Sequence, residues 1–182
     1  MKVLVVIDMQ NDFITGSLGT PEAVEAVPRV VEKIRSWSGG PIYATQDTHF
    51  ANYLETQEGR VLPVEHCIQG TEGWKIESSV RAALTEGAGR NESVLYLTKA
   101  TFGSRDLAEV LAQRQRTESI EEIVLVGLCT DICVISNALV LKAFLPEVPI
   151  TVDAACCAGV NPESHRDALR AMRMCQIGIC NE

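Results

Sequence analysis

Short apolar runs rich in β-branched residues recur along the chain and predict β-strands. These six runs cover residues 2–7, 41–46, 93–98, 122–127, 148–153 and 176–179. Between them, apolar residues recur at intervals of three and four and predict helices over residues 21–37, 76–84, 104–114, 131–144 and 162–174. Two helices also have start signals, because Thr20 precedes Pro21 and Asn161 precedes Pro162.

The predicted strands and helices alternate throughout, and the strands are apolar on both faces. This pattern favours an α/β fold in which helices cover both faces of a parallel sheet, in three layers. With 182 residues, of which 46% are apolar, the chain is expected to form one domain over residues 1–182. Ligands of open parallel sheets bind beyond the carboxyl ends of the strands, so the residues after each run form the candidate site.

Composition narrows the range of partners. A net charge of −8 argues against nucleic acid, and no stretch approaches the ~20 apolar residues of a membrane span. The first residues, MKVLVVIDMQ, reach Asp8 after a short apolar run and do not read as an export signal. We therefore expect a cytoplasmic protein with a small-molecule partner. The odd count of seven cysteines fits reduced, mostly buried thiols rather than a disulfide scaffold.

Asp8, Lys99 and Cys133 follow the first, third and fourth runs. A carboxylate, an ammonium group and a thiol can form an activated nucleophile, because a cation lowers the thiol pKa and a carboxylate can accept its proton. The dipole of the predicted helix also favours a thiolate at Cys133, and two amide N–H groups at that turn can hold an oxyanion. Taken singly, each residue has a structural alternative: a turn cap, a solvated loop lysine or a core thiol.

Asp47 and His49 follow the second run, and His66 lies later in the same connection. One carboxylate and two imidazoles suit a divalent transition metal. The alternative is that they are ordinary polar residues of a long loop.

Three motifs resemble those of the isochorismatase-like cysteine hydrolases, a family that includes the nicotinamidases. They are VVIDMQNDF (5–13), LTKATFGS (97–104) and VGLCTDICVISNAL (126–139). The resemblance implies a Rossmann-like sheet of strand order 3-2-1-4-5-6 and a catalytic triad of Asp8, Lys99 and Cys133. It also implies a cis peptide between Leu128 and Cys129, with the amides of Cys129 and Cys133 forming an oxyanion hole.

Resemblance to the nicotinamidase branch implies that Asp47, His49 and His66 bind a divalent metal that receives the ring nitrogen of the substrate. Zinc is the expected metal, with iron and manganese as alternatives. Glu58 is placed to be a further ligand, and Glu55 is the alternative.

By motif position, Phe13 is the expected substrate contact, and Phe102 and Trp74 can add apolar surface. The sequence departs from the branch at D-T-H-F (47–50), where D-W-H-P is usual, and at Leu62, where an aromatic is usual.

The expected function is hydrolysis of a small amide, such as nicotinamide to nicotinate and ammonia, through a cysteine thioester in a homo-oligomer. One alternative is a metal-free hydrolase of the same superfamily, of the isochorismatase type or acting on a carbamoyl or ureido compound. An acidic substrate of that kind would need arginines near the site to bind its charge. Arg60 and Arg105 are the arginines that lie close to the motifs in the sequence. The other alternative is a non-catalytic binding protein on the same fold.

Overall fold

The computed structural model describes residues 1–88 and 94–182. Six parallel strands form one sheet of order β3-β2-β1-β4-β5-β6, which confirms the predicted fold class and strand order. The strands are β1 (Lys2–Ile7), β2 (Ile42–Asp47), β3 (Val94–Lys99), β4 (Glu122–Leu128), β5 (Ile150–Ala158) and β6 (Gly178–Cys180). The predicted third strand starts at Ser93, which lies outside the described residues.

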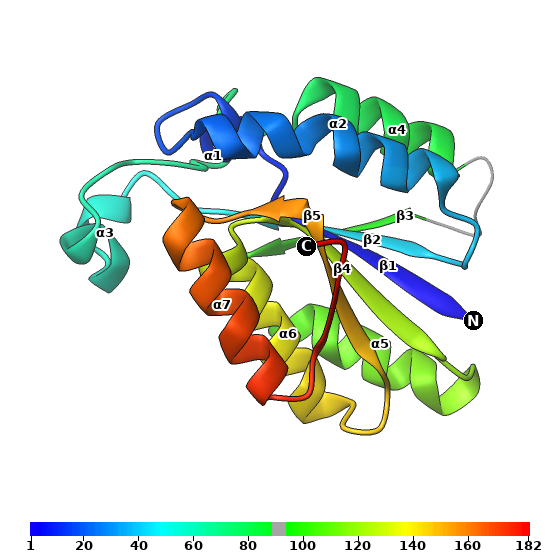
Figure 1. The fold of residues 1–182 in the computed structure, drawn as a ribbon. Coiled ribbons are helices and arrows are strands. Elements are labelled where there is room, and N and C mark those ends of the chain that lie inside the picture. The colour runs from blue at the N-terminus through cyan, green and yellow to red at the C-terminus, as the bar shows by residue number, and fades with distance from the viewer. Residues whose placement is uncertain (89–93) are drawn as a thin grey trace.

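Helices cover both faces of this sheet (Figure 1). They are α1 (Asn11–Ile14), α2 (Pro21–Ser36), α3 (Gln57–Val61), α4 (Ser78–Ala88), α5 (Arg105–Thr117), α6 (Ile135–Phe144) and α7 (Pro162–Met174). Helices α2 and α4 lie on one face and α5, α6 and α7 on the other, whereas α3 lies beyond the carboxyl ends of the strands (Figure 1). Among the described residues, no helix combines the length and the apolar character that crossing a membrane requires.

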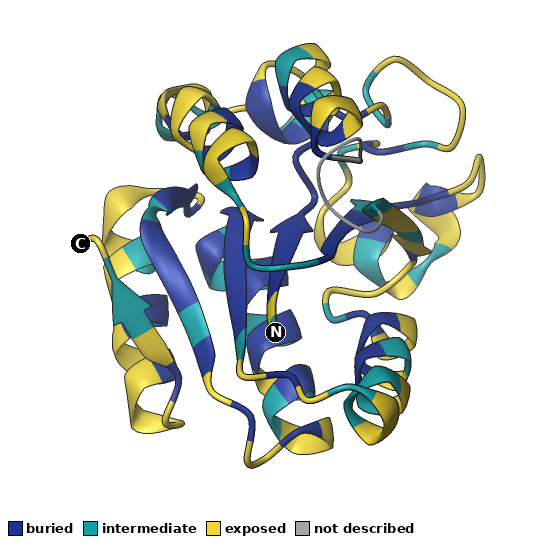
Figure 2. Ribbon diagram, turned by 90° about the vertical axis from the view of Figure 1, so that its right-hand side faces the viewer, coloured by how far each residue is buried: buried dark blue, intermediate teal, exposed yellow. Residues whose placement is uncertain are grey.

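Strand β1 explains why the apolar runs are continuous. Val3, Val5 and Ile7 belong to the core under α5, α6 and α7, and Leu4 and Val6 belong to the core under α2 and α4. Successive side chains of a strand point to opposite faces, so a strand buried on both faces needs an apolar residue at every position. Figure 2 shows the central strands buried and the outer helix surfaces exposed.

Two parts of the fold differ from the sequence prediction. Strand β5 continues to Ala158 rather than ending at residue 153, because Cys157 and Ala158 pair with Gly127 and Leu128 of β4. Small alanine and cysteine residues give little local strand signal, so this extension depends on its neighbour. Helices α1 and α3 and a short 3₁₀ turn, η1 (Tyr53–Glu55), were not predicted.

Candidate active site

Three side chains from three strand ends meet at the carboxyl edge of the sheet. Lys99, the last residue of β3, places its Nζ 2.6 Å from Asp8 Oδ2 and 3.5 Å from Cys133 Sγ. Asp8 follows β1 in a left-handed backbone conformation, with φ +47°, and accepts a hydrogen bond of 2.7 Å from Thr45 Oγ1. All four residues are buried. The structure thus brings together the three residues that the sequence placed in a triad.

Burial controls the protonation of this cluster. Burial and the charge of Asp8 raise the pKa of the Cys133 thiol well above its ordinary value, and the charge of Lys99 offsets only part of this. Burial also raises the pKa of Asp8, against the opposing charge of Lys99. The sequence suggested a thiolate at Cys133. The structure instead favours a neutral thiol beside a carboxylate that can accept its proton, because desolvation outweighs the attraction of one cation.

Lys99 remains protonated in this setting. Burial lowers the pKa of Lys99, but the charges of Asp8 and Asp47, together with the hydrogen bond to Asp8, outweigh that effect and leave the pKa raised. Its Nζ also lies 3.3 Å from Asp47 Oδ1, so the ammonium group touches the adjoining polar cluster as well as the thiol.

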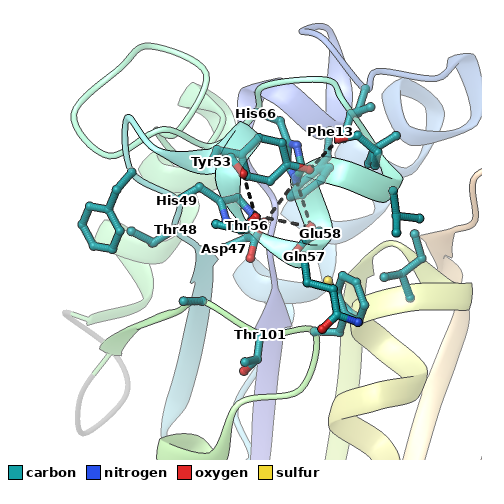
Figure 3. Close-up of a pocket in the computed structure, with 18 of the residues that line it drawn as sticks. Phe13, Asp47, Thr48, His49, Tyr53, Thr56, Gln57, Glu58, His66 and Thr101 are labelled. Carbon is teal, nitrogen blue, oxygen red and sulfur yellow. Dashed lines mark hydrogen bonds and ion pairs between the residues drawn. The ribbon is translucent and has the colours of Figure 1, made fainter.

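That adjoining cluster consists of Asp47, His49, His66 and Glu58 (Figure 3). Asp47 Oδ2 lies 3.0 Å from His49 Nε2 and 3.6 Å from His66 Nε2. Glu58 Oε1 lies 3.6 Å and 3.7 Å from the same two nitrogens. Glu55 is exposed on the surface, so of the two candidate glutamates the structure brings Glu58 to the cluster.

The cluster fits a divalent metal. Four ligand atoms about 2.1 Å from a tetrahedral ion lie roughly 3.4 Å from one another, and the four distances from a carboxylate oxygen to an imidazole nitrogen here are 3.0–3.7 Å. His49 Nε2 is buried and has no hydrogen-bond partner among the described residues. His66 Nδ1 lies 2.8 Å from the carbonyl oxygen of Val64. Because a carbonyl only accepts, Nδ1 carries the proton and Nε2 presents a lone pair to the cluster.

Tyr53 packs against both imidazole rings and was missed by the sequence analysis. Its ring centroid lies 4.7 Å from that of His49 and 5.0 Å from that of His66, in both cases edge-on. Its hydroxyl donates to the carbonyl oxygen of Leu62 at 2.9 Å. No local pattern marks this tyrosine, because its role depends on a loop that folds back over the strand ends.

Residues of the first motif hold the segments of Asp47 and His66 in place. Gln10 is fully buried; its Oε1 accepts the Asp47 N–H at 2.7 Å and its Nε2 donates to the Asp47 carbonyl oxygen at 2.8 Å. Asp12 Oδ2 accepts the N–H of Cys67 at 2.7 Å, next to His66. These two polar residues therefore position two distant segments. In the sequence, only their place in the first motif indicated that they were important.

The thiol is carried by a π-helical turn, η2 (Thr130–Val134), that follows β4. The peptide bond between Leu128 and Cys129 is cis. Just before it, Gly127 has φ +119°, and a Cβ there would lie 2.1 Å from a backbone oxygen of β1, so only glycine fits. Asn137 Nδ2 donates to the Cys133 carbonyl oxygen at 2.8 Å, which fastens the turn to α6.

Cys133 and the cluster of Asp47, His49, His66 and Glu58 line a cavity of about 700 Å³. Figure 3 shows that cluster among other residues that line the cavity. Phe13, the expected substrate contact, lines it, and so does Phe102, which was expected to add apolar surface. Trp74 instead supports the wall, because its Nε1 donates to Thr48 Oγ1 at 2.9 Å. Among the described residues that line the cavity there is no lysine or arginine, so neither Arg60 nor Arg105 contributes to it.

Comparisons with known proteins identify the family of the chain. The isochorismatase domain model matches residues 2–181. A nicotinamidase of Escherichia coli (strain K12) is 27% identical over 199 residues, covering 97% of this chain and 92% of the relative. Two crystal structures share the fold. A Bacillus subtilis nicotinamidase/pyrazinamidase has 29% sequence identity and a TM-score of 0.82, and the match covers 100% of both chains. A Pyrococcus horikoshii pyrazinamidase in complex with zinc has 27% identity and a TM-score of 0.80, and the match covers 100% of this chain and 99% of that one. The resemblance of the three motifs is thereby confirmed, and the chain belongs to the isochorismatase family.

Proposed function

We propose that the chain is a cysteine hydrolase of the nicotinamidase type, which converts a small amide to its acid and ammonia. The position of Lys99 carries this proposal. Its Nζ lies 2.6 Å from Asp8 Oδ2, 3.5 Å from Cys133 Sγ and 3.3 Å from Asp47 Oδ1. One ammonium group therefore joins a proton acceptor, a nucleophile and a metal-ligand cluster. Full-length relatives named nicotinamidase and pyrazinamidase support the same reading.

In the proposed mechanism, Asp8 accepts the proton of Cys133, and the thiolate that forms pairs with Lys99. The sulfur then attacks the amide carbonyl carbon, and the N–H groups of Cys129 and Cys133 stabilise the tetrahedral oxyanion. Asp8 returns the proton to the leaving nitrogen, the C–N bond breaks, and ammonia departs to leave a thioester. Water attacks the thioester and gives a proton to Asp8, and the C–S bond then breaks to release the acid. Asp8 returns the proton to the departing sulfur, which regenerates the free thiol.

Asp47, His49 and His66, with Glu58 beside them, would hold the metal, and we propose zinc for that position. When bound, it supplies a Lewis acid that orients a ring nitrogen of the substrate. The donor set of one or two carboxylates and two imidazoles supports zinc, and the pyrazinamidase from Pyrococcus horikoshii was crystallised with that metal.

Ammonia release from nicotinamide, measured before and after chelation, tests the proposal. We expect one equivalent of divalent metal in the purified protein, loss of activity on chelation and recovery with added zinc. Iodoacetamide should still alkylate Cys133 in the chelated protein, because the thiol and its base do not depend on the metal. Metal analysis below about a tenth of an equivalent, with activity unaffected by chelation, favours the metal-free hydrolase. Absence of Cys133-dependent ammonia release from any amide refutes the function itself.

We also propose that the protein assembles as a homo-oligomer and works in the cytoplasm. Leu95 and Tyr96 are exposed on β3, at an edge of the sheet where another chain can pack. All seven cysteines are free thiols, which fits a reducing compartment. Sedimentation equilibrium of the purified protein tests the assembly.

A further inference from the structure

The cavity is larger than a single-ring amide requires. Nicotinamide has nine non-hydrogen atoms and fills roughly 150 Å³ at the packing density of organic solids. The cavity holds about 700 Å³, which is in the range for ligands of several times that size. A single ring that reaches Cys133 and the metal-ligand cluster therefore leaves most of the space to water.

The outer part of the cavity is apolar and faces solvent. Phe50, Val61, Leu62 and Phe102 all line it, and they are 55%, 82%, 37% and 49% exposed. Single exposed apolar side chains are ordinary, but apolar side chains gathered around one opening usually mark a binding site. Val61 and Leu62 come from the end of α3 and Phe50 from the loop after β2, so separate segments build this wall.

The outer wall of the cavity offers no cation to an acidic group on the substrate. The described residues that line the cavity include no lysine or arginine, and its carboxylates, Asp47 and Glu58, lie in the cluster with His49 and His66 that would hold the metal. A carboxylate that extends along the outer wall would therefore give up water without gaining a cationic partner. The floor of the same cavity holds Cys133 and the imidazoles of the metal-ligand cluster. A ligand that covers the apolar wall can therefore also reach the nucleophile, and this favours a substrate over a second copy of the chain.

We infer that the substrate is an uncharged carboxamide that carries an apolar group beyond a single ring. The amide carbon lies at Cys133, and the apolar group extends between Phe50 and Val61 toward solvent. This inference rests on the proposed function and specifies the substrate class of the same site.

The test compares kcat/KM for nicotinamide with that for nicotinamides bearing a propyl group, a phenyl group or a carboxylate at ring carbon 5 or 6. At least one apolar derivative should be hydrolysed about tenfold faster or more, since even one methylene in an apolar pocket changes kcat/KM by roughly tenfold. The carboxylated derivatives should be hydrolysed more slowly than nicotinamide.

Two variants and two matched controls locate the effect. Phe50→Ala and Val61→Ser should each reduce the preference for the best apolar derivative over nicotinamide by about fivefold or more. Phe144→Ala and Val24→Ser remove exposed side chains of the same two types away from the cavity and should leave the preference unchanged.

The outcomes separate the two claims. If nicotinamide is hydrolysed and no apolar derivative is better, the inference fails while the proposed function stands. The inference is also overturned if both cavity variants keep the wild-type preference for the apolar derivative over nicotinamide. It is likewise overturned if these variants change the oligomeric state of the protein without changing that preference. If no amide releases ammonia, the proposed function fails and the inference fails with it.

Discussion

Replacing Gln10 with methionine should weaken both the fold and the metal site, although Gln10 is not expected to touch the metal or the substrate. Gln10 is fully buried and makes three hydrogen bonds to the backbone of two segments. Its Oε1 accepts the Asp47 N–H at 2.7 Å, and its Nε2 donates to the carbonyl oxygens of Asp47 and Trp74, both at 2.8 Å. Methionine has a similar volume but neither donates nor accepts strongly, so the change removes these bonds without leaving a large cavity.

The expected loss follows from the groups left without partners. An unsatisfied buried polar group costs about 1–3 kcal/mol. Part of that cost is recovered when the backbone relaxes or water enters, so we expect Gln10→Met to lower the free energy of unfolding by about 2–4 kcal/mol. Because Asp47 is then held less firmly, zinc affinity should fall by roughly 10–100-fold, as for other residues that orient metal ligands.

Gln46→Met is the matched control. Gln46 Nε2 donates to the same Trp74 carbonyl oxygen, at 3.2 Å. This variant should lose about 1 kcal/mol or less and keep its zinc affinity within about threefold. Urea unfolding of the metal-free proteins gives the stabilities, and calorimetric titration with zinc under native conditions gives the affinities. The positioning argument is wrong if Gln10→Met binds zinc like the wild type, or if the two variants lose equal stability.

The remaining predictions concern the triad and one helix cap. Cys133→Ala should abolish ammonia release while Cys129→Ala keeps most of it, because only the amide of Cys129 is needed; equal losses would refute these roles. Lys99→Met and Asp8→Asn should each reduce kcat by at least about 100-fold in folded protein, and an unchanged rate and pH profile for Lys99→Met would remove it from the triad. Although burial raises the pKa of Glu77, hydrogen bonds from the Ser79 side chain and from backbone N–H groups at the start of α4 leave it lowered. Its stabilisation is therefore present above the unfolded pKa of about 4.3 and is lost as pH falls through the lower folded value. In urea unfolding, Glu77→Ala should cost about 1 kcal/mol at pH 7, and the difference from wild type should shrink toward pH 3; a constant difference would contradict the cap.

The fold was largely predictable because its signals are local and repeated. Each central strand is buried on both faces, so continuous apolar runs appear in the sequence, and β1 was predicted with its observed bounds. The extension of β5 was not predictable in this way, because residues such as Ala158 become strand only by pairing with β4. Motif resemblance supplied the strand order, which apolar periodicity does not encode.

The site was predictable as far as its residues lie in the three motifs or stand out by residue type. Asp47, His49 and His66 stand out by residue type, and the structure brings them within 4.8 Å of one another. Tyr53, which packs against both histidines, has no such signal. The protonation of Cys133 was also beyond the sequence, because it depends on how completely the surrounding loops exclude water.

The position of β1 in the sheet explains why so much of the site depends on one short motif. β1 lies between β2 and β4, at the point where the strand order reverses, and ligand sites of such sheets form there. The segment that follows β1 runs between Asp47, at the end of β2, and the turn after β4 that carries Cys133. Asp8 can therefore contact Lys99, while Gln10 and Asp12 reach the segments of Asp47 and His66. Substitutions in residues 8–13 should thus disturb the triad and the metal cluster together, whereas substitutions in the turn after β4 should disturb the nucleophile alone.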